Sequence, residues 1–343
     1  MTQAGADAKW RTWRVAGERA LYDATNGFYR TARQPARHFR TSVHASPHFA
    51  GALLTVLAEV DAALGHPARL DVVDVGAGGA ELLAGFARLA PAELTARLRP
   101  VAVEVAPRPT ALDPRIAWTS AIPASITGVV IANEWLDNIP VDVAEQTADG
   151  PRLTMVDPAT GAERAGEPPD EADRRWLDRW WPLRATGARA EIGRPRDEAW
   201  AAVLGSLTRG VALAMDYAHE AADRPVFGTL TGYRDGRQVL PVPDGSCDIT
   251  AHVALDACAA AGVGAGATAT VLSDQRTALC SLGVLGRRPP ISVARSDPAR
   301  YLRDLRRAGE DAELIDRAGL GAHGWLVQAV GTGIPAPLRD GMR

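Results

Sequence analysis

The sequence contains almost no lysine. Lys9 is the only one among 38 basic residues, and the others are arginines. Because Lys9 lies near the start of the chain, we expect it in a frayed tail and not in a buried site. Schiff-base and pyridoxal enzymes, phosphate-loop nucleotidases and dehydrogenases with a catalytic lysine all need a buried lysine. The composition therefore disfavours each of these classes.

Cysteine is also scarce. The three cysteines, Cys247, Cys258 and Cys280, are scattered along the chain and form no CxxC pair. A disulfide framework or a zinc site would require closer, repeated spacings. We expect three small buried or half-buried thiols and no bound metal.

Long apolar runs and excess positive charge are absent from the sequence. No run approaches the length of a membrane span, and the first twenty residues lack the apolar core of a signal peptide. A cytoplasmic location is expected by default. The net charge of −3 disfavours a nucleic-acid binder that relies on a broad basic surface. The 343 residues suffice for one large domain with an insertion or for two modest ones.

The most informative stretch runs from residue 70 to residue 89. An apolar, β-branched segment at 70–75 is followed by Gly76, Gly78 and Gly79, and then by apolar residues at helical spacing over 81–89. This pattern predicts a strand, a tight turn and a helix, the first unit of a doubly wound sheet that binds nucleotides. Glycine permits positive φ and close approach of a ligand to the backbone.

The residues around this turn favour S-adenosylmethionine over a dinucleotide such as NAD. A dinucleotide fingerprint needs a third glycine where this chain has Glu81, and a glutamate at a helix start opposes a pyrophosphate. Asp74 precedes the turn, which suits the cationic S-adenosylmethionine, and Glu104 at the end of the next strand can accept both ribose hydroxyls. We therefore predict S-adenosylmethionine as the cofactor, with NAD as the weaker alternative.

A second polar group follows the buried apolar strand predicted at 128–132. Asn133, Glu134 and Asp137 come directly after it, at the carboxyl edge of the sheet where doubly wound folds keep their active sites. The alternative is that Asp137 caps a turn and Glu134 is solvated. We expect instead that two carboxylates and an amide lie beside the methyl donor.

The remaining pattern predicts how the chain is divided. A hairpin with its turn at 149–150 and an acidic loop at 163–171 interrupt the alternation of strands and helices. A fifth strand at 211–215 and a late hairpin that ends with the strand 324–330 complete the sheet. The predicted fold is an α/β, doubly wound, Rossmann-like class I methyltransferase sheet with four parts: an N-terminal cap arm (1–65), the cofactor-binding half (66–140), an inserted substrate-side subdomain (141–200) and the second half of the catalytic domain (201–343).

Several segments together resemble the MidA-like methyltransferases, the group that includes a mitochondrial complex I assembly factor thought to methylate an arginine. NEWLDNIPV at 133–141 is similar to the motif NExxDxxPV, the most specific match, and ALYDATNGFY at 20–29 resembles ALYDPxxGYY. VVDVGAGGAELL, ALAMDYAHE, GTLTGYRDGRQV with DITAHV, and SDQRTALCSLGV resemble further family segments in the same order. The matches run from about residue 21 to residue 285.

The resemblance and the pattern together give a set of expected site residues. Expected to act in catalysis are Glu134, Asp137, Asp216 and His252. Expected to bind the cofactor are Asp74, Gly76, Gly78, Gly79, Glu104 and Asn133. Expected to contact the substrate are Tyr233, Arg234 and Asp248. The resemblance implies methyl transfer to a protein arginine, whose planar cation needs carboxylates to orient it. A protein partner and a homodimer are expected.

One segment departs from the family pattern. Where the family has GDFxTxPE, this chain has RHFRTSVH at 37–44, so the expected aspartate and glutamate are missing. His38 and His44 would place cationic groups near a sulfonium. The departure leaves two alternatives open, an assembly or scaffold protein that kept the fold with weakened catalysis, and a divergent methyltransferase of a small molecule.

Overall fold

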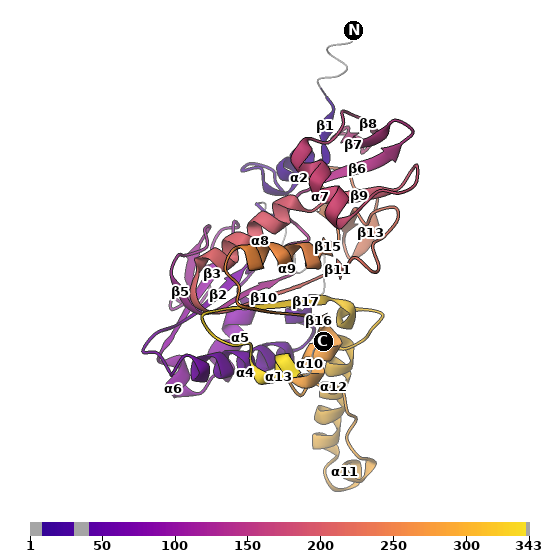
Figure 1. Ribbon diagram of the computed structural model, residues 1–343. Helices are drawn as coiled ribbons and strands as arrows, with labels where there is room; N and C mark the ends of the chain where they lie inside the picture. Colours follow the sequence, from indigo (N-terminus) through magenta and orange to yellow (C-terminus); the bar gives the residue numbers. More distant parts are fainter. Residues whose placement is uncertain (1–8, 31–40, 341–343) are drawn as a thin grey trace.

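A seven-stranded sheet forms the centre of the protein (Figure 1). The computed structural model describes residues 9–30 and 41–340. Five neighbouring strands run parallel, and the last strand pairs antiparallel with two others. In spatial order the strands are β16 (Ala269–Asp274), β17 (Gly324–Val330), β10 (Leu207–Asp216), β5 (Ile126–Asn133), β2 (Leu70–Val75), β3 (Leu98–Val103) and β4 (Ala117–Thr119). The predicted doubly wound sheet and its late antiparallel pairing are confirmed.

Helices cover both faces of this sheet (Figure 1). One face packs against α4 (Pro47–Ala63), α5 (Glu81–Leu89) and α10 (Gln275–Ser281), and the other against α8 (Arg194–Ser206) and α9 (Leu255–Gly264). Along β5, Val129 and Ile131 belong to the first apolar layer and Val130 to the second. Because successive side chains of a strand point to opposite faces, a strand between two helical layers is apolar throughout.

A second sheet lies beside the first and is built mostly from residues 142–192. Its strands in order are β1 (Arg11–Thr12), β7 (Gly150–Val156), β6 (Asp142–Thr147) and β9 (Arg189–Ile192), with β8 (Glu163–Ala165) paired to β7. The helices α2 (Trp13–Tyr22) and α7 (Glu171–Trp180) lie beside these strands. The domain boundaries at 65, 140 and 200 stay predictions.

The N-terminal part of the described chain begins with Arg11 and Thr12 paired to β7, and the helix α2 follows from Trp13. One local prediction is wrong. The segment 163–171, predicted as an acidic loop, contains the strand β8. Its side chains are all exposed, so the sequence shows no strand pattern there, and its backbone pairs with β7.

The long loop after β10 is more ordered than its sequence suggests. It contains β11 (Ala218–His219) paired with β15 (Val253–Ala254), and a small sheet of β12 (Thr231–Arg234), β13 (Arg237–Val239) and β14 (Asp248–Thr250). This sheet places Tyr233 opposite Asp248. Such short strands leave no periodic signal in the sequence.

The remaining helices are short, except for one that projects from the body. They are α3 (Ser42–Ala45), α6 (Ala92–Thr95), α11 (Ile291–Ser296), α12 (Pro298–Leu314), η2 (Leu320–Ala322) and α13 (Ala336–Asp340). The pair α11 and α12 extends away from the sheet (Figure 1). Within the described part of the chain, none of the helices has the length and apolar character to cross a membrane.

Candidate active site

The glycine turn after β2 has a backbone that few other residues could adopt. Gly76 and Gly78 have φ of +72° and +55°. A Cβ atom at Gly76 would lie 2.9 Å from Cδ1 of Trp135, so both the conformation and the packing require glycine there. Ala80 is also left-handed, with φ of +63°, immediately before α5 begins at Glu81. The turn leaves an open, backbone-lined surface at the edge of the sheet.

Glu104 fixes the other side of this turn. Its carboxylate accepts hydrogen bonds from the Gly78 N–H (2.9 Å), the Val105 N–H (2.7 Å) and the Ala106 N–H (3.0 Å). These bonds join the end of β3 to the glycine turn and hold the carboxylate at the cavity wall. The arrangement fits the predicted contact with ribose hydroxyls.

The acidic residue before the turn is buried. Asp74 is 4% exposed, and burial, with additional repulsion from Glu81 and Glu104, raises the pKa of its carboxyl to about 8. Asp74 therefore stays mostly protonated at neutral pH unless a cation arrives. Glu81 itself is paired with His44, at 3.6 Å, and accepts from the Gly79 N–H at 3.0 Å. The hydrogen bond to Glu81 raises the pKa of His44.

Glu134 occupies a strained position directly after β5. Its φ is +52°, an uncommon value for a residue with a side chain, and its N–H donates to the Met215 carbonyl at 2.8 Å. Its carboxylate accepts from the Ser42 N–H at 3.1 Å and the Asn133 amide at 3.3 Å. Burial is the main cause that raises the pKa of Glu134 to about 7. The Oδ1 atom of Asn133 is buried and has no hydrogen-bond donor in the described structure.

Asp137 and Asp216 form a buried acidic pair. The Asp137 N–H donates to Asp216 Oδ2 at 3.1 Å, and the Thr250 hydroxyl donates to Asp137 Oδ2 at 2.6 Å. The Oδ1 atom of each aspartate has no donor among the described residues. Burial raises the pKa of both carboxyls, and their mutual repulsion raises that of Asp216 further. Both groups thus disfavour the charged state in the absence of a cation.

The N-terminal segment supplies one wall of the site. Tyr22 and Tyr29 are stacked with ring centroids 5.6 Å apart, and the Tyr29 hydroxyl donates to Asp248 Oδ1 at 2.8 Å. Burial raises the pKa of Asp248 to about 7. The segment predicted as a cap arm therefore also lines the cavity, through Tyr22, Tyr29 and Arg30.

These residues surround a cavity of about 1000 Å³ at the carboxyl edge of the sheet. Seven carboxylates line it, against one arginine (Arg30) and one histidine (His44). The predicted site residues that line it are Asp74, Gly76, Gly78, Gly79, Glu104, Asn133, Glu134, Asp137, Tyr233 and Asp248. The cavity therefore favours cationic ligands.

Three predicted residues do not line the cavity, which corrects their expected placement. Asp216 is fully buried behind Asp137. Arg234 is exposed and donates to the Ser246 carbonyl at 3.2 Å. His252 is exposed, and its ring stacks on Tyr217 with centroids 5.7 Å apart. Residues 37–40 of the divergent segment, with His38, lie outside the described residues.

Arg196 is a site-supporting residue that the sequence did not reveal. It is 2% exposed and donates to the carbonyls of Asp137 (2.6 Å), His252 (2.8 Å) and Ile139 (3.2 Å). It thus joins the loop after β5 to the segment that carries Thr250. Arg196 lies in the first turn of α8, which begins at Arg194. The proline after Arg194 is a helix-start signal that could have revealed it.

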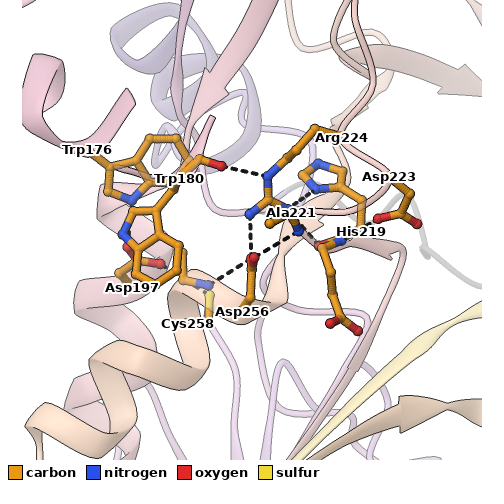
Figure 2. Close-up of polar contacts among 11 residues, drawn as sticks. Trp176, Trp180, Asp197, His219, Ala221, Asp223, Arg224, Asp256 and Cys258 are labelled. Carbon is orange, nitrogen blue, oxygen red and sulfur yellow. Dashed lines mark hydrogen bonds and ion pairs between the residues drawn. The ribbon is translucent and has the colours of Figure 1, made fainter. Parts of the chain in front are cut away.

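A second polar cluster lies outside the cavity and joins the two sheets (Figure 2). Arg224 donates to the carbonyls of Trp180 (2.8 Å) and His219 (2.9 Å) and pairs with Asp256. The indole N–H of Trp176 donates to Asp197 at 2.7 Å. Asp197 and Asp256 each have donors on both carboxylate oxygens. The cluster therefore contributes stability and has no free oxygen to offer a ligand.

Comparison with known proteins now identifies the family. Residues 53–273, more than half of the chain, match the family described as "putative S-adenosyl-L-methionine-dependent methyltransferase". The chain belongs to this family. This S-adenosylmethionine-dependent methyltransferase thus has the predicted cofactor and not a nicotinamide dinucleotide. No curated protein gave a match.

Two solved structures from Burkholderia thailandensis resemble this methyltransferase along its whole length. One is a protein regarded as a methyl transferase and bound to S-adenosyl-homocysteine, with 26% identity, a TM-score of 0.80, and 99% of this chain and 93% of that chain covered. The other is an uncharacterized protein of the same superfamily, with 25% identity, a TM-score of 0.81 and the same coverage.

The residues present fit the cofactor. The glycine turn is open at Gly78, where a Cβ atom would meet only Glu81 Oε2, at 3.8 Å, and the buried Oδ1 atom of Asn133 is an acceptor without a donor in the described structure. The acidic lining suits a ligand that carries a sulfonium and an ammonium. Asp74, Glu104 and Asn133 are the residues that would hold it.

Proposed function

We propose that this methyltransferase transfers a methyl group to an arginine side chain of a protein, as the MidA-like resemblance implies. The observation that carries the proposal is the excess of carboxylates in the cavity, seven against Arg30 and His44. The cofactor accounts for one net positive charge, because its own carboxylate offsets one of its two cationic groups. The carboxylates of Glu134, Asp137 and Asp248 lie beyond those at the glycine turn and suit a second cation.

A guanidinium matches this part of the cavity in shape and charge. It is planar and always charged in water, and it donates pairs of parallel hydrogen bonds to carboxylates. The aromatic rings of Tyr22, Tyr217 and Tyr233 line the same cavity and can pack against its flat face. Lysine lacks this planar shape.

Glu134 is proposed to orient the acceptor and to take its proton. When bound, S-adenosylmethionine would supply a methyl group on a sulfonium. The acceptor nitrogen would bond to the methyl carbon as the C–S bond breaks, and neutral S-adenosylhomocysteine would leave with the electron pair. The acceptor nitrogen gains a C–N bond and afterwards loses one N–H proton. A carboxyl with a pKa of about 7 can bind that proton at neutral pH. Asp137, held by Thr250 and Arg196, would keep the loop of Glu134 in place.

The test uses purified protein, labelled S-adenosylmethionine and lysate of the source cells. Labelled proteins are digested, and the modified residue is identified by mass spectrometry. We expect a mass increase of one or more methyl groups on arginine. Methyl groups found only on another residue type or on a small molecule would contradict the proposal. Cofactor binding without transfer to any acceptor would instead favour the scaffold alternative.

A further inference from the structure

Positive charge is concentrated in the segment that contains α11 and most of α12, and the last residues of α12 are acidic (Glu310, Asp311 and Glu313). Residues 287–309, here called the arginine arm, contain seven arginines against two aspartates, a net charge of +5. Because the whole chain carries −3, the rest of the chain carries −8. The protein is therefore divided into an acidic body and a basic arm.

The charges of the arm are free to meet a partner. All seven arginines are exposed. Two of them have ion pairs, Arg300 with Asp304 at 3.5 Å and Arg306 with Glu310 at 3.0 Å. The other five, listed by number as 287, 288, 295, 303 and 307, have no ion pair with a described residue. Exposed arginines of this kind are enriched at protein interfaces.

The base of the arm adjoins the wall of the active site. The helix α12 packs against α3, and Asp311 of α12 pairs with His48. Val43 and His44 of α3 line the cavity. The arm extends outward from this contact (Figure 1). A protein that places an arginine in the cavity therefore has part of its surface near the arm.

We propose that the arginine arm is a docking site for an acidic segment of the protein substrate. This inference rests on the proposed function, since it assumes a protein acceptor. Guanidinium groups bind carboxylates with paired hydrogen bonds, so an arginine-rich surface is suited to a segment rich in glutamate or aspartate. The cavity would select the target side chain and the arm would select the protein that carries it.

Two other anionic partners fit less well. An anionic membrane needs a broad apolar helix face, whereas α11 and α12 pack against each other and leave Ile291 and Leu302 as their large exposed apolar residues. A nucleic acid would meet a body that carries −8, which repels a long polyanion. An acidic segment of a protein is short enough to contact the arm alone.

The first experiment measures binding and is independent of methyl transfer. The probe is a fluorescent peptide with eight glutamates and no arginine, compared with the same peptide carrying eight glutamines. Fluorescence anisotropy is measured at low and high salt. We expect binding of the glutamate peptide only, weakened at least tenfold by Arg303→Glu with Arg307→Glu and by high salt, because screening weakens exposed charge pairs.

Matched variants separate charge at the arm from charge elsewhere. Arg303→Lys with Arg307→Lys keeps the charge and should retain most of the binding. Arg174→Glu with Arg184→Glu makes the same charge change at exposed arginines outside the arm and should change the affinity by less than threefold. Equal loss in both glutamate variants would overturn the inference. Circular dichroism confirms that each variant is folded.

The second experiment links docking to turnover. The substrates are an arginine peptide alone and the same peptide joined by glycine–serine linkers of several lengths to eight glutamates or eight glutamines. We expect the glutamate tract to lower KM about tenfold at one or more linker lengths without changing kcat. Arg303→Glu with Arg307→Glu should abolish this difference and leave turnover of the short peptide unchanged.

The outcomes distinguish the two proposals. No methylation of any arginine peptide, together with intact binding of the glutamate probe, would count against the proposed function alone. Methylation of the short peptide without any effect of the glutamate tract would overturn the docking site. Tighter binding to phosphatidylglycerol vesicles or to duplex DNA than to the glutamate peptide would also overturn it. So would a dimer in ultracentrifugation that Arg303→Glu with Arg307→Glu converts to monomer, since a second copy would then occupy the arm.

Discussion

Two regions of this methyltransferase bury acidic side chains next to aromatic rings, and they differ in how those acids are satisfied. In the cluster that joins the two sheets, Asp256 pairs with Arg224 and Asp197 accepts from Trp176 (Figure 2). At the cavity, Asp137 and the Asp216 buried behind it each have an oxygen without a donor among the described residues. In the first region, residues of the same chain donate to every oxygen of the two carboxylates. In the second region, oxygens remain that a bound cation could pair with.

The difference shows which acids are built for stability and which for function. A buried carboxylate without a cation costs free energy, so a protein keeps one only where a ligand compensates for it. The raised pKa values of Asp74, Glu134 and Asp248 express the same cost. Changing residues in the two regions should therefore have opposite effects on stability and activity.

Replacement of Glu134 should give the largest effect. Glu134→Gln keeps the shape of the side chain but removes the group proposed to take a proton. We expect kcat to fall by about 10²- to 10⁴-fold, measured with the acceptor that the labelling experiment identifies. The control is Asp256→Asn in the other region, which should leave kcat of the folded enzyme within about twofold. A Glu134→Gln enzyme with normal kcat would exclude Glu134 from the chemistry.

Removal of Arg196 should give the largest loss of stability. Its guanidinium holds the carbonyls of Asp137, His252 and Ile139 and lies near the buried aspartates. Arg196→Met leaves these groups uncompensated and should lower the free energy of unfolding by about 3–5 kcal/mol. Urea denaturation measures this change. A loss below about 1 kcal/mol would mean that Arg196 is not needed to hold the two loops together.

Two aspartate variants should move stability in opposite directions. Asp137→Asn leaves Asp216 as the one buried acid beside Arg196 and removes the repulsion between the two carboxyls, so it should raise the free energy of unfolding at pH 8 by up to about 1 kcal/mol. Asp256→Asn weakens the pair with Arg224 and should lower it by about 1–3 kcal/mol. Thermal unfolding without ligand compares them. If both variants change the free energy of unfolding in the same direction, the distinction between the two regions is wrong.

The pH dependence of stability should be a smaller effect with a defined sign. Asp74, Glu134 and Asp248 have folded-state pKa values of about 8, 7 and 7, above those of the unfolded chain. At these three carboxyls the folded protein binds more protons than the unfolded chain from about pH 4 to about pH 8, so the stability that they contribute should fall over that range. Burial lowers the pKa of His219 to about 3 and of His323 to about 4, which acts in the opposite direction, but only below about pH 7. The Tm of the unliganded enzyme should decrease from about pH 5.5 to about pH 8, and an increase would show that these carboxyls ionise freely in the fold.

The sequence was sufficient for the sheet and for the cofactor half of the site, because both depend on local patterns. The strand at 70–75, the glycine turn and the helix after it could be read from apolar spacing and positive-φ glycines. The motif at 133–141 was found at the end of β5 as predicted. These features depend on neighbours within a few residues.

The rest depends on contacts that no local pattern encodes. Asp216 at the end of β10 does not face the cavity, because its carboxylate accepts a hydrogen bond from the Asp137 N–H. Asp137 belongs to a segment far away in the sequence. Arg196 gains its role only because three carbonyls from two loops converge on it. The sequence did not predict the strands β8 and β9. Both are short, and they are strands because they pair with β7 and β6, not because of a pattern in their own residues.

The central claim, that unpaired carboxyls at the sheet edge await a cation, is tested most directly by counting protons during cofactor binding. Isothermal titration calorimetry at pH 7, in two buffers of different ionisation enthalpy, gives the number of protons released per ligand. S-adenosylmethionine carries the sulfonium, so its binding should ionise the Asp74 carboxyl and release more protons than binding of S-adenosylhomocysteine, which lacks it. Equal proton release for both ligands, or net uptake with S-adenosylmethionine, would contradict the account.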